Sequence, residues 1–115
     1  MTSKIFSAQV NGLRATIIEV EADISKGIRS FTIVGLPDKA VAEAKDRIAS
    51  ATKNSGIKSP FQGNRKVVIS LAPADLKKEG PVFDLAIALA HLTAGGIVTF
   101  NPEDKIFLGE LALNG

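Results

Sequence analysis

The stretch LAPADLKKEGPVFDLAIALA, from Leu71 to Ala90, has the pattern of a strand, a charged turn and an apolar helix. A strand that passes through a tight turn into a helix N-terminus is a common place to mount a nucleophile or to hold a phosphate group. Glu79 and Asp84 flank the expected helix start and could act as paired carboxylates in acid–base chemistry. They could also satisfy free N–H groups and complement the positive end of the helix, and we favour this structural role.

A second strand–turn–helix entry lies at Gly35-Leu36-Pro37-Asp38. Its backbone N–H groups could bind an anion. A helix with Pro37 in its first turn and Asp38 as cap or dipole partner explains the same residues. The chain contains no G-x-x-x-x-G-K-[ST] phosphate loop and no G-x-G-x-x-G pattern. The sequence therefore favours a capped helix over a nucleotide site.

Metal-binding and hydrolytic arrangements have little support. His91 is the only histidine, no carboxylate lies at ligand spacing on its helix face, and the chain has no cysteine, so we expect no metal site. A Ser-His-Asp triad would have to combine His91 with Ser70, which lies on a strand without the glycines of a nucleophile elbow. A lone histidine near a helix C-terminus is more typical of a packed or dipole-stabilised residue.

Basic residues gather in expected loops and at strand ends. Arg65, Lys66, Lys77 and Lys78, together with Lys58, could share one rim of the sheet and contact DNA or a neighbouring subunit. A solvated surface is the alternative, and the residue types alone favour it. The chain has six Phe but no Trp or Tyr, so no base-stacking platform for single strands is evident.

The elements that must position these residues follow from periodicity. Alternation predicts a half-buried strand over Lys4–Val10, with Phe6, Ala8 and Val10 on one face and the polar Ser7 and Gln9 on the other. Asn11-Gly12 predicts a hairpin turn into a second strand over Leu13–Ala22, where a shift in the apolar phase indicates a bulge.

The remaining segments alternate between strands and helices. We expect a strand over 28–34, a helix from about 37 to 54, an exposed loop over 59–64, a strand over 66–71, a helix over 81–94 and a last strand over 106–113. The second helix is apolar nearly all round, which predicts its burial against the sheet. The order β-β-β-α-β-α-β predicts an α+β fold in which helices cover one face of a mixed sheet.

Composition limits the remaining possibilities. A chain of 115 residues with 45% hydrophobic and 23% charged residues is typical of one globular domain, here residues 1–115. The net charge of +2 comes from mostly interspersed charges, which is weak evidence for nucleic-acid binding. There is no apolar signal segment, no apolar stretch long enough for a membrane span, and no cysteine. We therefore expect a cytoplasmic protein without a membrane partner.

Three stretches together resemble a known family. They are FTIVGLPDKAVAEAKDRI, NSGIKSPFQGNRKVVISLAPADLKKEGPVFDLAIALA and IFLGELALNG. They resemble the N-terminal domain of magnesium-chelatase-like AAA+ ATPases of the ComM family, from about Lys4 to Gly115. The resemblance implies a fold similar to the Lon-protease proteolytic domain and to domain 2 of some ribosomal proteins. It also marks six motif residues to which we assign structural roles: Gly35, Pro37, Asp38, Glu79, Gly80 and Asp84.

The same resemblance places Val82 where Lon-type peptidases carry their nucleophilic serine. A valine side chain has neither a proton to give up nor a lone pair to attack with. The resemblance therefore implies a non-catalytic accessory domain. A Ser–Lys peptidase-like domain and a standalone nucleic-acid-binding module remain as alternatives.

The resemblance further implies a longer protein. The chain ends at Asn114-Gly115, a hairpin signal without its second strand, and we expect it to be a fragment. Family members continue into an AAA+ module with a phosphate loop, so ATP and Mg²⁺ are expected there and no cofactor is expected in this domain. The implied partners are that module, neighbouring subunits of a hexamer, and DNA undergoing branch migration during natural transformation.

Overall fold

The computed structural model describes residues 1–57 and 63–115, and Lys58 with most of the predicted 59–64 loop lies outside them. The strands are β1 (Thr2–Asn11), β2 (Arg14–Lys26), β3 (Ser30–Val34) and β4 (Arg65–Ala72). The helices are α1 (Lys39–Ala42), α2 (Ala44–Asn54), a 3-10 turn η1 (Pro81–Phe83) and α3 (Asp84–Ala94). The strands form one mixed sheet in the order β1-β2-β4-β3, with only β3 and β4 parallel.

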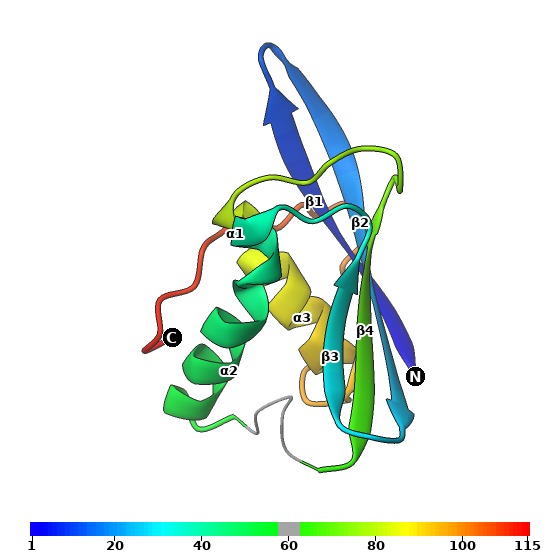
Figure 1. The fold of residues 1–115 in the computed structure, drawn as a ribbon, viewed down its shortest axis with the longest axis vertical. Coiled ribbons are helices and arrows are strands. Elements are labelled where there is room, and N and C mark those ends of the chain that lie inside the picture. Colours follow the sequence, from blue (N-terminus) through cyan, green and yellow to red (C-terminus); the bar gives the residue numbers. More distant parts are fainter. Residues whose placement is uncertain (58–62) are drawn as a thin grey trace.

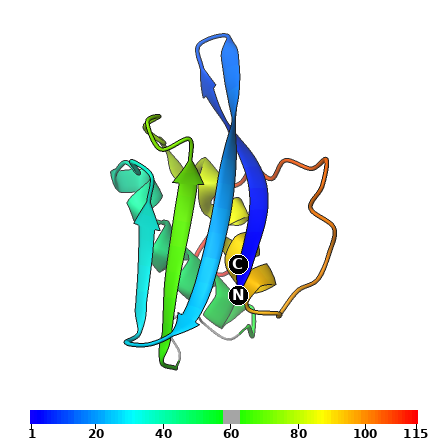
Figure 2. The ribbon, with the colours of Figure 1, turned by 90° about the vertical axis from the view of Figure 1, so that its right-hand side faces the viewer.

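The helices cover one face of this sheet, which confirms the predicted α+β class (Figure 1). Figure 2 shows the four strands side by side, with the segment that follows α3 running along the β1 side. The core lies between α3 and the helix-facing rows of the strands. Its fully buried members include Ile18, Val20, Val67, Ile69, Phe83 and Ile87. Each such side chain contributes about 1.5–3 kcal/mol by leaving water, and the predicted burial of the second helix is confirmed.

The orientation of β1 differs from the one that hydrophobicity indicates. Ile5, Ser7 and Gln9 face the helices and are buried, whereas Phe6 and Ala8 lie on the other face. Ser7 Oγ donates a hydrogen bond of 2.8 Å to the carbonyl oxygen of Phe107. Gln9 bonds to the loop after β4, as described below. Polar groups face inward here because distant backbone segments supply their partners.

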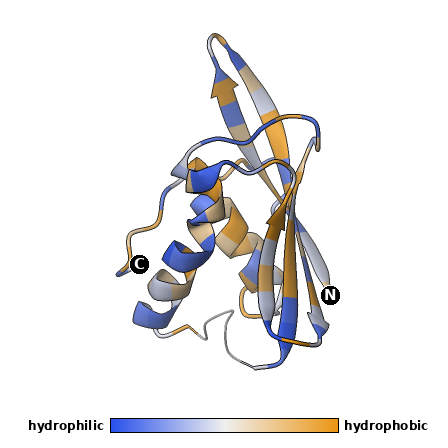
Figure 3. Ribbon diagram, in the orientation of Figure 1, coloured by the Kyte–Doolittle hydropathy of each residue, from blue (hydrophilic) through white to orange (hydrophobic). Residues whose placement is uncertain are grey.

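The predicted bulge in β2 is wrong. β1 and β2 pair without interruption from Thr2 opposite Asp23 to Asn11 opposite Arg14. The apolar phase shifts because Ile17 lies on the strand face that points away from the helices, whereas Ile18 and Val20 face them, and the end of the hairpin projects beyond the helices (Figure 1). Val10, Leu13 and Ile17 are accordingly exposed, and Figure 3 shows apolar segments on this projecting hairpin.

Two further predictions need correction. The helix expected over 37–54 is divided at Glu43 into α1 and α2, with Asp38 as the N-cap of α1 and Pro37 outside the helix. The segment expected as a last strand, 106–113, contains no strand. It makes isolated bonds instead: Phe107 N–H donates to the Phe6 carbonyl at 2.9 Å, and Gly109 N–H donates to the Val82 carbonyl at 2.9 Å.

Candidate functional site

The two motif loops, residues 35–38 and 77–80, are held against each other. Lys78 N–H donates to the Leu36 carbonyl at 2.9 Å, and Asp38 N–H donates to the Lys78 carbonyl at 2.9 Å. Pro37 and Lys78 thereby form a parallel β-bridge. The strand–turn–helix entry after β3 and the turn before α3 therefore form one unit, although some 40 residues separate them.

Two side chains fix this unit further. One carboxylate oxygen of Asp38 accepts the Val41 N–H at 2.8 Å, which caps α1, and the other accepts the Gly80 N–H at 3.1 Å. The amide of Gln9 donates to the Lys77 carbonyl at 2.8 Å and accepts the Glu79 N–H at 2.8 Å. The cap predicted for Asp38 is confirmed, whereas the role of Gln9 was not foreseen.

The turn therefore has no free N–H group from Lys78 to Gly80. The N–H groups of Lys78, Glu79 and Gly80 donate to Leu36, Gln9 and Asp38, respectively. A substrate oxyanion or a phosphate would need such donors. The N–H groups of these three residues could hold it only by breaking bonds that the fold already makes.

Gly35 permits the close approach of β3 and β4 that this arrangement needs. Its φ is +106°, and a Cβ atom there would lie 2.1 Å from the carbonyl oxygen of Leu71. A side chain at this position would overlap the backbone of β4. The structural role assigned to this motif residue thus has a steric cause.

Val82 lies in η1 and is partly buried against the core. It borders a hollow of about 380 Å³ together with Ala8, Val10 and Leu108, and the only ionisable residue in this lining is Glu79. The described residues of this lining contain no hydroxyl group and no lysine. They therefore do not supply a Ser–Lys dyad.

Asp84 is fully buried and connects three segments. Its carboxylate accepts Arg47 Nε at 2.6 Å and Nη2 at 3.0 Å, and it also accepts the Leu111 N–H at 3.1 Å. The bond to Asp84 raises the pKa of Arg47 above its ordinary value. Arg47 was not singled out from the sequence, and this pair, 37 positions apart, was missed.

Asp84 thus bonds to Arg47 and to the backbone of Leu111, and not to the helix-start N–H groups that the sequence suggested. Within the described residues, no side chain caps η1 or α3 by a hydrogen bond. Asp84 still lies in the first turn of α3, where its charge complements the helix dipole. The same turn is tied to the C-terminal segment, because Leu85 N–H donates to the Gly109 carbonyl at 3.1 Å.

The expected common rim of basic residues does not exist in the described structure. Arg65 and Lys66 begin β4, whereas Lys77 and Lys78 follow its opposite end. Lys78 is fully buried, and its ammonium donates to the Pro73 carbonyl. Burial lowers the pKa of Lys78, and the charge of Asp75 opposes this change. Of the predicted contact residues, Arg65, Lys66 and Lys77 are exposed.

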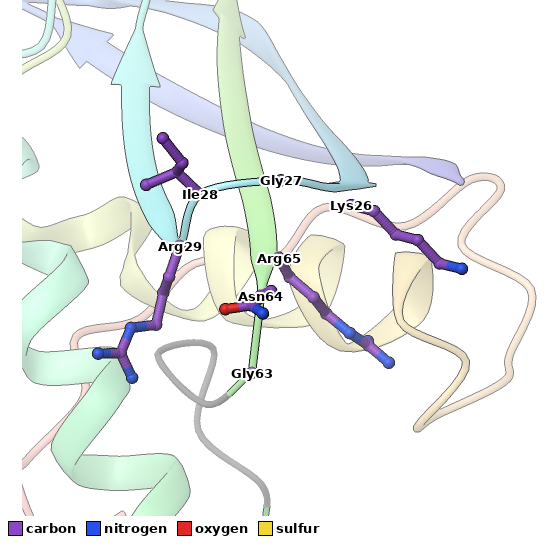
Figure 4. Close-up of a pocket in the computed structure, with 7 residues that line it drawn as sticks. All are labelled: Lys26, Gly27, Ile28, Arg29, Gly63, Asn64 and Arg65. Carbon is purple, nitrogen blue, oxygen red and sulfur yellow. The ribbon is translucent and has the colours of Figure 1, made fainter.

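A different basic cluster lies where β2 turns into β3 and β4 begins. Figure 4 shows Lys26, Arg29 and Arg65 spread around a cleft of about 980 Å³. The turn at Lys26-Gly27 was predicted, but the pairing of Lys26 with Arg65 was not. No pattern in the sequence gives the register between β2 and β4, because 38 residues separate these two strands.

His91 lies on α3 near this end of the sheet and is 5% exposed. Its ring packs edge-to-face on Phe31 at a centroid distance of 6.1 Å, and its Nδ1 has no hydrogen-bond partner among the described residues. Burial and then the positive charge of Arg65 lower the pKa of His91 to about 4. In residues 1–57 and 63–115, no three His, Cys, Asp or Glu side chains come together as metal ligands. No helix in those same ranges is long and apolar enough to cross a membrane.

Comparison with known proteins decides the family. The family model described as subunit ChlI of Mg-chelatase matches residues 20–115. The chain belongs to this ChlI family. It is 50% identical over 105 residues to the uncharacterized protein YifB of Escherichia coli K12, which covers 90% of this chain and 20% of YifB. It is 40% identical over 112 residues to the competence protein ComM of Haemophilus influenzae, covering 96% of this chain and 21% of ComM.

A mycobacterial relative gives the same picture. The uncharacterized protein Rv2897c of Mycobacterium tuberculosis is 40% identical over 113 residues, which is 97% of this chain and 22% of that protein. The ChlI-family chain thus spans about one fifth of the length of the curated relatives it matches. The resemblance to ComM-type proteins is confirmed.

Proposed function

We propose that this ChlI-family chain is a non-catalytic accessory domain, with a Lon-protease-like fold, of a cytoplasmic ring-forming AAA+ ATPase of the ComM type. Its role would be to assist ring assembly and DNA handling by the motor. The match to a competence protein over nearly the whole chain supports this proposal. The relatives' greater length supports a further module, in which ATP and Mg²⁺ would be used.

The turn around Val82 is the observation that carries the non-catalytic part. This position has a hydrocarbon side chain, and the N–H groups of Lys78, Glu79 and Gly80, the three residues before Pro81, are all engaged. A hydrolase of this geometry would need a nucleophile and donors for an oxyanion. Val82 supplies no nucleophile, and residues 78–80 supply no unengaged N–H donor.

The chain's own residues do not fit a nucleotide. It has no phosphate loop, and Asp38, whose helix start could have bound an anion, uses both carboxylate oxygens within the fold. We therefore derive no step of ATP hydrolysis from this domain. Its contribution to the motor would be binding and assembly.

The experiment uses the natural full-length protein and a version that lacks residues 1–115. We expect the full-length protein to hydrolyse ATP, to form rings in sedimentation, and to migrate branches in a synthetic four-way DNA junction. The shortened protein should hydrolyse ATP but migrate branches more slowly or assemble less. A natural protein that neither hydrolyses ATP nor extends beyond this chain would refute the proposal and favour a standalone module.

A peptidase assay on the same full-length protein tests the non-catalytic part separately. We expect no cleavage of fluorogenic casein above the signal of a buffer control. Cleavage that is abolished by replacing one serine of this domain, such as Ser3→Ala or Ser7→Ala, would establish the peptidase alternative. Both hydroxyls are already bonded to backbone carbonyls, of Ala90 and Phe107, which is why we expect neither to act as a nucleophile.

A further inference from the structure

The cleft between the β2–β3 turn and the start of β4 concentrates positive charge. Lys26 ends β2, Arg29 lies just before β3, and Arg65 begins β4, and all three side chains are exposed. No carboxylate occurs among the described residues that line the cleft, whose neutral members include Gly27, Gly63 and Asn64 (Figure 4). The lining is thus cationic, although the chain as a whole carries a net charge of only +2.

Sheet register forces two of these cations together. Lys26 and Arg65 are directly opposed in the antiparallel β2–β4 pair. Opposed residues have Cβ atoms about 4.5–5.5 Å apart, and like charges at this spacing destabilise a sheet. The C-terminal end of α3 offsets part of this repulsion, because Ala94 and Gly95 border a second hollow with the same two residues. A bound anion would reduce the repulsion between Lys26 and Arg65 further.

The acidic residues of β2 do not neutralise the cleft. Glu19, Glu21 and Asp23 lie on the strand's outer face, since Ile18, Val20 and Ala22 face the helices and Lys26 continues that helix-facing row. Glu19 also pairs with Lys4 at 3.7 Å, and Asp23 pairs with the N-terminal ammonium at 3.8 Å. The field of Arg65 extends into the protein, where it helps to lower the pKa of His91. The acidic residues of β2 are therefore separated from Lys26 and Arg65.

The shape and lining of the cleft indicate which anion would bind. A volume of about 980 Å³ is far larger than one phosphate needs, and the cations come from three separate segments. Among the described residues that line the cleft, none has an aromatic side chain on which a base could stack. Contacts to phosphates alone position a nucleic acid without reading its bases.

We propose that this cleft binds the phosphate backbone of a nucleic-acid strand independently of sequence. The choice of DNA as the biological strand rests on the proposed function, whereas the cationic cleft does not. The site replaces the rim of Arg65, Lys66, Lys77 and Lys78 inferred from the sequence, because only the β4-start members of that set lie at this end of the sheet.

The test compares variants of the natural full-length protein by fluorescence anisotropy with a labelled DNA duplex. The test variant combines Lys26→Gln, Arg29→Gln and Arg65→Gln, and the matched control is Lys77→Gln, an exposed lysine beyond the other end of β4. A second control, Arg65→Lys, keeps the charge. Each lost phosphate contact flattens the slope of log K against log salt by about 0.9. We expect the triple variant to lose about 2–3 in slope and at least about 10-fold in affinity at low salt, with the Lys77→Gln control unchanged.

Each of the following results would contradict the proposal that this cleft binds a nucleic-acid backbone. An unchanged slope in the triple variant would refute it, and a simultaneous loss of ring assembly would assign the cleft to an acidic protein surface. Equal losses in the Lys77→Gln control would indicate general surface charge. Competition by thymidine monophosphate as strong as that by the strand would indicate a single-phosphate site. ATP hydrolysis and ring formation, measured in the wild-type protein, test the proposed function separately from these slopes.

Discussion

His91 makes the stability of this fold depend on pH in a way that can be measured without ambiguity. Its pKa in the folded chain is about 4, compared with an ordinary value of 6.5. Between these values the unfolded chain binds a proton that the folded chain does not, so stability falls as the pH falls from about 6.5 to about 4. This pKa difference corresponds to a loss of about 3 kcal/mol in the free energy of unfolding. The contribution of His91 does not change with pH above or below this window.

The assay is urea unfolding of the wild type and His91→Leu at pH 7 and pH 4. Carboxylates contribute equally to both proteins, so the wild type should lose about 3 kcal/mol more than the variant over this interval. The imidazole can also be followed by NMR, and the assignment is certain because the chain has a single histidine. Its signal should titrate with a midpoint near 4, and Arg65→Gln should raise that midpoint.

Two results would refute this reasoning. A midpoint near the ordinary value of 6.5 would show that the ring is hydrated in the folded state. Equal losses of stability in the wild type and His91→Leu would show that the histidine is not responsible. Either result would contradict the packing of His91 against Phe31.

Two predictions concern the buried contacts. Asp84→Asn should lower the free energy of unfolding by about 3–5 kcal/mol, because it leaves the Arg47 charge and the Leu111 N–H without an anionic acceptor. Urea unfolding should show this loss, whereas the exposed control Asp46→Asn should cost less than about 1 kcal/mol. Similar costs for the two variants would contradict the bridging role of Asp84. Gly35→Ala should cost at least about 3 kcal/mol, because its Cβ would lie 2.1 Å from the Leu71 oxygen. Gly12→Ala also has a positive φ but nothing within 4 Å, so it should cost only about 1–2 kcal/mol; equal losses in thermal unfolding would refute the steric argument.

The sequence predicted the fold where local pattern is sufficient. The strands expected over 13–22 and 66–71 and the apolar circumference of α3 follow from residue types in short windows, and the structure confirms these two strands and the burial of α3, although not the bulge. The Asp38 cap was predicted for the same reason, since the capped N–H lies only three residues away. These features depend on neighbours along the chain.

Contacts between distant segments could not be predicted in this way. Ser7 and Gln9 appeared to belong outside because they are polar, yet the backbone partners that pull them inward lie 100 and about 70 residues away. Lys78 appeared to belong to a basic surface, yet its loop folds over it. The cationic cleft arises from the opposition of Lys26 and Arg65. Each of these features depends on how distant segments align or cross, and hydrophobic periodicity along the chain does not give that information.

The hydrogen bonds that hold the turn before α3 do not involve the side chain of Val82. Gln9, Asp38 and the backbone of Leu36 bind residues 77–80, and Val82 itself contributes only its carbonyl oxygen, to Gly109. The hydrogen bonds that shape the turn therefore do not depend on which side chain stands at position 82. Over evolutionary time, a lineage can lose or acquire a hydroxyl at this position by a single substitution while the surrounding architecture is inherited intact.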